Sequence, residues 1–459
     1  MSTIVGMPSC TLFSAQMHVL YTRADGLVLD DYYDGDARDW FQQNISQRPS
    51  ETPAAIGETF ALQTEHELHA LFRDARNHII HVYFVDGQGW RWDDLTDMAQ
   101  APAASSDPVA LVYEKAMQVF YRDARNQIAR LRYTGHGAWS YENLSSTLPD
   151  VPAAEGRPSV LDYYRQLHLV FRIDGGDLYH LYRDPKAGWR SDRLMREAKG
   201  MRPAAGEPFL MATDEELHVL YRDTQDAISH VYYARGWLAE VLDEKVHRAP
   251  GAKGDPRGLV YAERMRVFFR SKSDDIFEYY YAGKGKWGKN NLNEQAGDDI
   301  GASGDPTAII YAEQDHVVYR DAQGRVADLY QEGLNGQWTH QVIDDKISDL
   351  HKVGMIALQN KGVELKVAQR FMYFDKDGNL KITEATSKPY PAPQSHTSVL
   401  SEYGVPHGAE VWLCADVSGG RGSQAHVPCI NQRGGKATAR FHISGTTQSN
   451  NVKFDGVST

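Results

Sequence analysis

The sequence predicts an all-β protein, with a seven-bladed β-propeller in residues 1–348 followed by a small β-sandwich in residues 349–459. Three observations support this prediction. An arginine-centred motif recurs seven times, a tryptophan follows it in each copy, and each copy divides into short apolar runs separated by turn residues. The composition agrees, because 25 Tyr, 15 Phe and 9 Trp favour strands while 39 Gly and 19 Pro favour turns.

The repeat keeps one period in both of its markers. Successive arginines are 50, 49, 50, 50, 48 and 50 residues apart, and successive tryptophans are 50, 49, 50, 48, 50 and 51 residues apart. Such a fixed period over seven copies indicates a repeat architecture. The arginines are Arg23, Arg73, Arg122, Arg172, Arg222, Arg270 and Arg320, and the tryptophans are Trp40, Trp90, Trp139, Trp189, Trp237, Trp287 and Trp338.

Each repeat contains about four short strands. In the last repeat they are expected at residues 306–313, 315–321, 325–331 and 338–344. Four strands per period of this length are typical of a propeller blade, and a closed ring of blades protects the sheet edges. Because the chain begins near the inner strand of the first repeat and the last repeat is complete, we expect closure by packing of blades 1 and 7 rather than by strand exchange.

After residue 348 the repeat stops and alternating short strands follow. The DKDGN sequence at 375–379 resembles part of a calcium loop, but it lacks the downstream acidic ligand and favours a hairpin turn. The expected strands of this second domain cover residues 355–360, 362–375, 380–384, 410–417, 437–445 and 452–456.

The overall charge argues against nucleic acid as a partner. The chain has 61 Asp and Glu against 49 Lys and Arg, a formal net charge of −12, and no basic run that offsets this locally. The N-terminus lacks the pattern of a secretory signal, and no apolar stretch is long enough to span a membrane. We therefore expect a cytoplasmic protein or one released without a Sec signal.

Cysteine usage predicts neither a disulfide scaffold nor a zinc site. The three cysteines, Cys10, Cys414 and Cys429, are too few and too widely spaced for either. Cys414 and Cys429 could pair in an oxidising compartment, but two reduced thiols are the favoured state. No cofactor is expected.

The two repeat markers each have a structural and a functional interpretation. The arginine at the end of the second strand either braces the seam between blades through a carboxylate or carbonyl, which we favour, or contacts a ligand. The tryptophan either anchors packing or forms a platform for a sugar, and packing is again favoured.

The second and third strands also carry a polar pair in every blade. Folding each hairpin about its turn is expected to place these residues opposite one another. The pairs either satisfy each other by hydrogen bonds or bind a ligand. They are His18 with Asp31, His69 with His81, Gln118 with Arg130, His168 with His180, His218 with His230, Arg266 with Glu278, and His316 with Asp328.

The functional interpretation of these pairs is a notch that binds sugar hydroxyls. Planar donors and acceptors bridge adjacent hydroxyls, while an aromatic ring covers the apolar face of the sugar. Several weak sites would then act together by multivalency. The candidate carbohydrate-binding residues are Arg266, Glu278, Trp287, His18, Asp31, His69, His81, His168, His180, His218, His230, His316, Asp328, Trp90, Trp139, Trp189, Trp237 and Trp338.

The stretch RVFFRSKSDDIFEYYYAGKGKW, residues 266–287, resembles a blade of the propeller lectins, especially the fungal fucose-binding and the seven-bladed bacterial families. This resemblance implies that Arg266, Glu278 and Trp287 hold a sugar. Five other blades carry His in place of the arginine, so the candidate ligands extend from fucosylated to O-methylated sugars. The tail SGTTQSNNVKFDG resembles the small β-sandwich of some bacterial cytolysins.

The sequence carries no motif of an enzyme. Sialidase-type boxes, a phosphate-binding glycine loop and a G-x-S-x-G elbow are missing, and no blade has a distinct acidic cluster. The His pairs lack the third ligand of a metal site. We expect a multivalent carbohydrate-binding lectin that recognises glycans or glycoconjugates and could form a homo-oligomer. The alternative is a non-catalytic protein-interaction scaffold, or the targeting part of a toxin-like protein.

Overall fold

The computed structural model describes residues 3–346, except 36–37, 47–51, 86–88, 185, 262–263 and 334–335, and then the segments 369–374, 380–385, 411–414, 424–431, 436–446 and 449–458. Contacts divide the chain into two compact units, one of residues 1–32 with 44–346 and one of residues 33–43 with 347–459. The predicted boundary at 348–349, the predicted strand 355–360 and the DKDGN turn lie outside the described residues.

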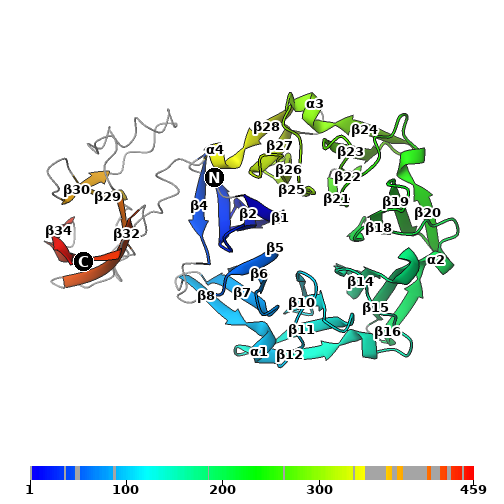
Figure 1. The fold of residues 1–459 in the computed structure, drawn as a ribbon, viewed down its shortest axis with the longest axis horizontal. Coiled ribbons are helices and arrows are strands. Elements are labelled where there is room, and N and C mark those ends of the chain that lie inside the picture. Colours follow the sequence, from blue (N-terminus) through cyan, green and yellow to red (C-terminus); the bar gives the residue numbers. More distant parts are fainter. Residues whose placement is uncertain are drawn as a thin grey trace. The chain divides into compact units, whose positions relative to one another are not determined.

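Residues 4–342 form seven four-stranded antiparallel sheets, which are the ring of blades in Figure 1. Within each blade the strands follow one another in sequence order, from the axis to the rim. Blade 1 contains β1 (Ile4–Phe13), β2 (Gln16–Arg23), β3 (Val28–Asp34) and β4 (Asp39–Asn44). Blade 2 contains β5 (Ala55–Gln63), β6 (Glu67–Asp74), β7 (Ile79–Val85) and β8 (Gly89–Asp94). Blade 3 contains β9 (Val109–Tyr113), β10 (Ala116–Arg122), β11 (Ile128–Gly135) and β12 (Ala138–Asn143).

The remaining four blades repeat this plan. Blade 4 contains β13 (Ser159–Tyr163), β14 (Gln166–Arg172), β15 (Leu178–Asp184) and β16 (Gly188–Arg193). Blade 5 contains β17 (Phe209–Ala212), β18 (Leu217–Arg222), β19 (Ile228–Tyr233) and β20 (Trp237–Val241). Blade 6 contains β21 (Arg257–Tyr261), β22 (Arg264–Arg270), β23 (Ile276–Tyr281) and β24 (Trp287–Asn291). Blade 7 contains β25 (Thr307–Tyr311), β26 (Gln314–Arg320), β27 (Val326–Glu332) and β28 (Trp338–Val342), close to the strands predicted for this repeat.

Short helices follow the fourth strand in most blades. They are α1 (Leu95–Ala99), α2 (Leu194–Glu197), α3 (Leu292–Ala296), α4 (Ile343–Lys346) and the 3-10 turns Leu144–Ser146 and Leu242–Glu244; a further 3-10 turn, Asp174–Gly176, joins β14 to β15. None of the helices in the described part of the chain is long and apolar enough to cross a bilayer.

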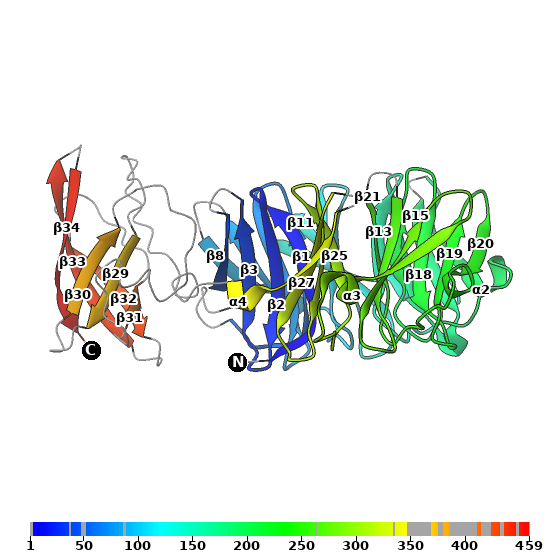
Figure 2. The ribbon, with the colours of Figure 1, turned by 90° about the horizontal axis from the view of Figure 1, so that it is seen from above.

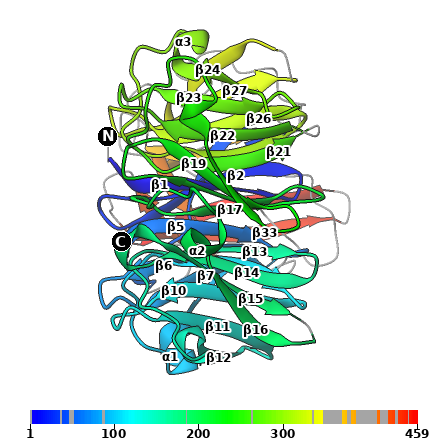
Figure 3. The same cartoon turned by 90° about the vertical axis from the view of Figure 1, so that its right-hand side faces the viewer.

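The hydrophobic core lies between neighbouring blades. Figures 2 and 3 view the ring from the side, where the strands of one blade stand against those of the next. Phe120 of β10 and Phe171 of β14, for example, are both fully buried in one cluster that joins blades 3 and 4. The second strand of each blade is covered on both faces, so its sequence is a nearly continuous apolar run. In blade 7, for example, β26 is buried from Asp315 to Tyr319.

The repeated arginine braces the seams, as the favoured interpretation predicted. Arg73 of blade 2 lies 3.2 Å from the carboxylate of Asp107 in blade 3. Arg320 of blade 7 donates to the carbonyl of Ile4 in blade 1 at 3.1 Å. A charged hydrogen bond of this kind ties blade 2 to blade 3 and blade 7 to blade 1. Arg122 and Arg172 instead bond to Ser105 and Glu155, in the segments that lead into their own blades.

Blade 1 departs from the predicted alignment by one residue. The amide of Arg23 donates to the carbonyl of Leu27, whereas in blade 5 the matching donor is Asp223, the residue after the arginine. Thr22 therefore takes the place of the arginine, and its hydroxyl lies 2.8 Å from that of Thr59 in blade 2.

The ring closes by packing, as predicted. Blade 1 consists of β1 to β4 and blade 7 of β25 to β28, so no strand is exchanged. The amide of Ile4 donates to Gly324 at 3.1 Å, and the hydroxyl of Tyr311 donates to the carbonyl of Ala15 at 3.1 Å.

The described part of the second unit from residue 369 onward is one antiparallel sheet. Its strands are β29 (Gln369–Phe374), β30 (Leu380–Ala385), β31 (Val411–Cys414), β32 (Gln424–Asn431), β33 (Lys436–Thr446) and β34 (Ser449–Ser458), in the order β30-β29-β31-β32-β33-β34. β32 was not among the predicted strands. The β-sandwich itself stays a prediction, because only this sheet lies within the described residues.

Candidate functional site

Polar side chains form a ladder that crosses the outer three strands of a blade and reaches the tryptophan of the next blade. Blade 4 shows it most fully. His168 Nδ1 lies 2.9 Å from His180 Nε2, and His180 Nδ1 lies 3.0 Å from Asp192 Oδ2. The indole of Trp237, from blade 5, donates to the same Asp192 oxygen at 3.2 Å. The ladder therefore spans the seam between two blades.

Similar ladders occur in other blades. His69 and His81 of blade 2 make the same 2.9 Å contact. In blade 5, His218 lies 2.9 Å from His230, which lies 3.0 Å from Glu240.

In blade 7, the ladder ends on an amide instead of a carboxylate. His316 lies 2.9 Å from Asp328, and Gln341 donates to Asp328 at 2.8 Å. Sequence reasoning missed the fourth-strand members, although they recur about 24 residues after the second-strand residue in most blades.

The paired residues are not directly opposite, contrary to the prediction. In the register of β18 and β19, His218 faces Tyr232 and His230 faces Leu220. The two histidines are thus diagonal neighbours on one face of the sheet, within the reach of long side chains. Tyr232 stacks on His230, with ring centroids 4.9 Å apart.

The pair predicted in blade 1 is wrong by one residue. His18 contacts Asp30 at 3.0 Å, not Asp31. Asp31 instead accepts a hydrogen bond from the hydroxyl of Tyr21 at 3.0 Å. The error follows from aligning this repeat on Arg23, whose structural place belongs to Thr22.

Blade 6 carries the predicted Arg266 and Glu278 pair, but with a different aromatic partner. The Arg266 guanidinium bonds to Glu278 and to Asp315 of blade 7, and its carbon lies 5.5 Å from the ring centroid of Trp338. Trp287 instead lies edge-on to His230 of blade 5, at 6.2 Å. The prediction that Trp287 lies beside Arg266 is therefore wrong, because the repeated tryptophans of blades 3 to 7 lie against the preceding blade.

The second- and third-strand pairs are buried where both members are histidine. Burial lowers the pKa of His69 to about 4 and the pKa of His168 and of His218 to about 3. Burial also lowers the pKa of His81 and of His180. These imidazoles are therefore neutral at pH 7. One hydrogen bond joins the two rings of each pair, while Nδ1 of His81 and Nε2 of His168 are buried without a partner.

The fourth-strand carboxylates and some tryptophans are more accessible. The Asp192 side chain is 29% exposed, and although burial favours its neutral form, hydrogen bonds from His180 and Trp237 lower its pKa. Asp192 therefore offers a charged acceptor near the surface. Among the predicted tryptophans, Trp90, Trp189 and Trp237 are half-buried, whereas Trp139, Trp287 and Trp338 are buried.

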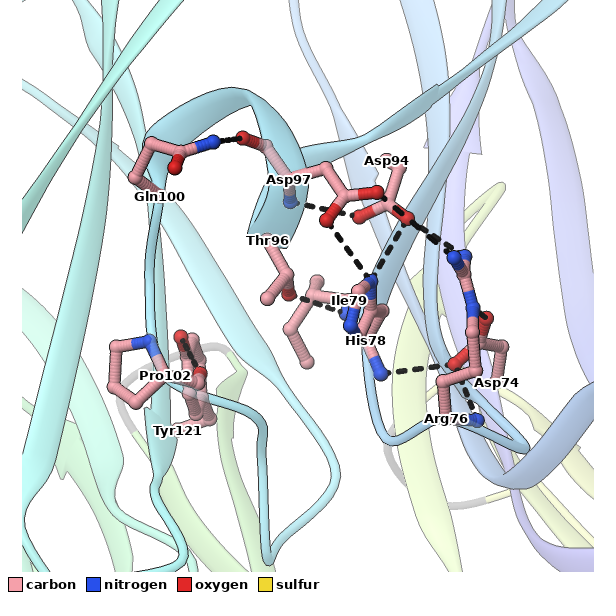
Figure 4. A network of polar contacts seen from close by, with 10 residues as sticks. All are labelled: Asp74, Arg76, His78, Ile79, Asp94, Thr96, Asp97, Gln100, Pro102 and Tyr121. Atoms are coloured by element: carbon pink, nitrogen blue, oxygen red, sulfur yellow. Dashed lines mark hydrogen bonds and ion pairs between the residues drawn. The ribbon is translucent and has the colours of Figure 1, made fainter.

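One group of three potential metal ligands occurs within the described residues, outside the ladders (Figure 4). His78 Nδ1 lies 2.9 Å from Asp94 and 3.6 Å from Asp97. Arg76 already donates to Asp94 at 2.7 Å, and Asp94 also caps α1 through the amide of Asp97. The cluster is therefore an ion-paired network that ties the hairpin turn to α1, and we assign no metal to it.

A polar cavity of about 280 Å³ is lined by residues in and just before the first strands of the blades, together with Arg73 and Arg122 from the ends of two second strands. Carboxylates here accept from the backbone of the preceding blade, as when the amide of Asp255 donates to Asp305 at 2.9 Å. Arg157 stands among these carboxylates and pairs across the cavity with Glu58 at 2.7 Å. Several of these residues occupy the middle position of a recurrent Gly-x-Pro pattern, which is the signal in the sequence that could have located them.

No family model and no curated protein sequence matches the chain. Among solved structures, the BP39L lectin from Burkholderia pseudomallei matches 73% of this chain and 98% of its own length, with a TM-score of 0.54 and 10% identity. The chain shares the fold of this bacterial lectin. AofleA from Arthrobotrys oligospora matches at 14% identity over 62% of this chain and 85% of its own, with a TM-score of 0.44. The Aleuria aurantia lectin matches at 12% identity over 63% and 94%, with a TM-score of 0.42.

Proposed function

We propose that this chain is a multivalent carbohydrate-binding lectin without catalytic activity, and that its sites lie in the seams between neighbouring blades. One observation carries the proposal: the fourth-strand carboxylate Asp192 shares its hydrogen-bonding oxygen with the half-buried indole of Trp237. An acceptor for hydroxyls beside an aromatic face is the combination that sugars require. The fold, shared with a protein described as a lectin, supports the proposal by analogy.

Within this proposal the predicted residues divide into two roles. Asp192 and Trp237 contact the sugar, and Trp90 and Trp189 present half-buried faces at two other seams. The pairs formed by His69 and His81, His168 and His180, His218 and His230, Arg266 and Glu278, and His316 and Asp328 lie deeper and orient the outer groups.

A glycan array with the intact chain tests the proposal, with fucosylated and O-methylated sugars included. Calorimetry on any hit should give more than one site per chain. Trp237→Ala should reduce the number of sites, whereas Leu238→Ala, a neighbouring exposed residue on the same strand, should leave it unchanged. Silence of the array at high protein concentration would overturn the proposal.

A non-catalytic interaction scaffold is the second candidate, and the burial of the histidine pairs favours it. His218 and His230 are each 3% exposed and bond to each other, so they hold the blade whether or not a ligand binds. Under this alternative, His218→Ala lowers the melting temperature and no glycan affinity changes.

A further inference from the structure

Blade 3 differs from the other six blades at two positions on one face of its third strand. The third-strand member of the polar pair is Asp, His or Glu in the other blades, and a tyrosine follows two residues later, as in His180 and Tyr182. Blade 3 carries Arg130 and Arg132 at these positions. At the seam between blades 3 and 4, one arginine therefore replaces the carboxylate or imidazole of the other blades, and a second arginine replaces their tyrosine.

Arg130 is buried without enough acceptors. It is 7% exposed, and Nη2 lies 3.0 Å from Glu142, but Nε and Nη1 have no partner. Nε of Arg132 and Oε1 of Gln118 are also buried and unpaired. A buried guanidinium with free N–H groups is costly, and such groups usually mark a missing water, ion or ligand.

Arg266 of blade 6 provides an internal comparison. It is equally buried, yet its guanidinium bonds to Glu278, Asp315 and Gln331. Each of the three guanidinium nitrogens of Arg266 thus has an acceptor within the chain. Arg130 lacks such a set of acceptors, which indicates that its acceptor comes from outside the chain.

The surroundings of Arg130 favour an anion attached to a ring. Besides Arg132, Arg183 of blade 4 lies close enough to repel the Arg130 charge, which adds to the burial that lowers the pKa of Arg130. Trp189 of blade 4 lies 5.9 Å from the guanidinium and is half-buried. Glu142, 39% exposed, can turn into solvent and open the site.

We propose that the seam between blades 3 and 4 binds a saccharide that carries a carboxylate, such as a uronic acid. Arg130 and Arg132 donate to the carboxylate, and Trp189 covers the apolar face of the sugar. This inference rests on the proposed lectin function and assigns one of its sites an acidic ligand.

Calorimetry with methyl glucuronide and its uncharged methyl ester tests the inference on the full chain. The unaltered chain should bind the acid at least about tenfold more tightly, since hydrogen bonds to charged groups are the strong ones. Arg130→Gln should abolish this preference, and added salt should weaken it. Arg125→Gln removes the same charge from an exposed turn of blade 3 and should keep the preference.

Melting temperatures separate a binding role from a structural one. Because Arg130 is underpaired, Arg130→Gln should not lower the melting temperature, and a marked decrease would assign Arg130 to the fold and overturn the inference. Equal affinity for acid and ester, while neutral glycans bind elsewhere, would also overturn it and leave the lectin proposal standing. A chain that binds no saccharide would overturn the lectin proposal itself.

Discussion

Lowering the pH from 8 to 5 is expected to destabilise the propeller, because blades 2, 4 and 5 each bury at least one histidine in its neutral form. His69, His168 and His218 have a folded-state pKa of about 4, about 3 and about 3, against an ordinary value of 6.5. The unfolded chain therefore binds more protons than the folded chain below pH 6.5. Stability is complete above that pH and declines as the pH falls toward the folded-state values.

The magnitude follows from the pH window. A pH of 5 lies about 1.5 units below the unfolded-state pKa of each of these histidines, and each is still neutral in the folded chain. Keeping one histidine neutral therefore lowers the free energy of unfolding by about 2 kcal/mol. Three residues together give about 6 kcal/mol, a large part of the stability of a typical domain. His81 and His180 act in the same direction.

Urea unfolding followed by circular dichroism at pH 8, 7, 6 and 5 measures this loss. Burial raises the pKa of Asp107, Glu207 and Asp255, and these groups act in the opposite direction. The decisive quantity is therefore the difference between the unaltered chain and a histidine variant in the loss of unfolding free energy. Between pH 8 and pH 5, the free energy of unfolding of the triple variant His69→Gln, His168→Gln and His218→Gln should fall by about 6 kcal/mol less than that of the unaltered chain.

The control is His66→Gln, which removes a histidine whose side chain is 79% exposed and should leave the pH dependence unchanged. The reasoning fails if the unaltered chain and the triple variant lose the same free energy of unfolding between pH 8 and pH 5. It also fails if the control alters the pH dependence as much as the triple variant.

Three further predictions concern single positions. Arg266→Ala should cost about 3 to 5 kcal/mol in unfolding free energy, because it leaves buried carboxylates without their cation; an unchanged urea midpoint would contradict the assigned pairing. Gly206→Ala should lower the melting temperature by several degrees, since the new Cβ would overlap the Asp255 carboxylate of the next blade, and a melting curve that does not move would show that the seam is loose. Cys414 and Cys429 are direct partners in the register of β31 and β32, so oxidised glutathione should convert them into one internal disulfide with release of two reduced glutathiones; peptide mass spectra with a glutathione adduct on each of the two instead would refute that register.

The sequence by itself determined the number of blades, the order of their strands and the closure of the ring. These features follow from local and periodic information: apolar runs of strand length, turn residues and two markers with one period. It also determined that His168 and His180, and their counterparts in blades 2 and 5, meet across a hairpin, because a short turn limits which residues can approach one another.

Only the tertiary structure decided which groups share a seam. Trp237 donates to Asp192 of the preceding blade, and Trp338 rather than Trp287 lies over Arg266. These partners are 45 and 72 positions apart in the sequence, so no hairpin relates them. Likewise, blade 1 carries Thr22 in the place of the arginine and pairs His18 with Asp30, because backbone hydrogen bonds fix the register of the hairpin. The missing partners of Arg130 appear only when the neighbouring blade is in place to bury it.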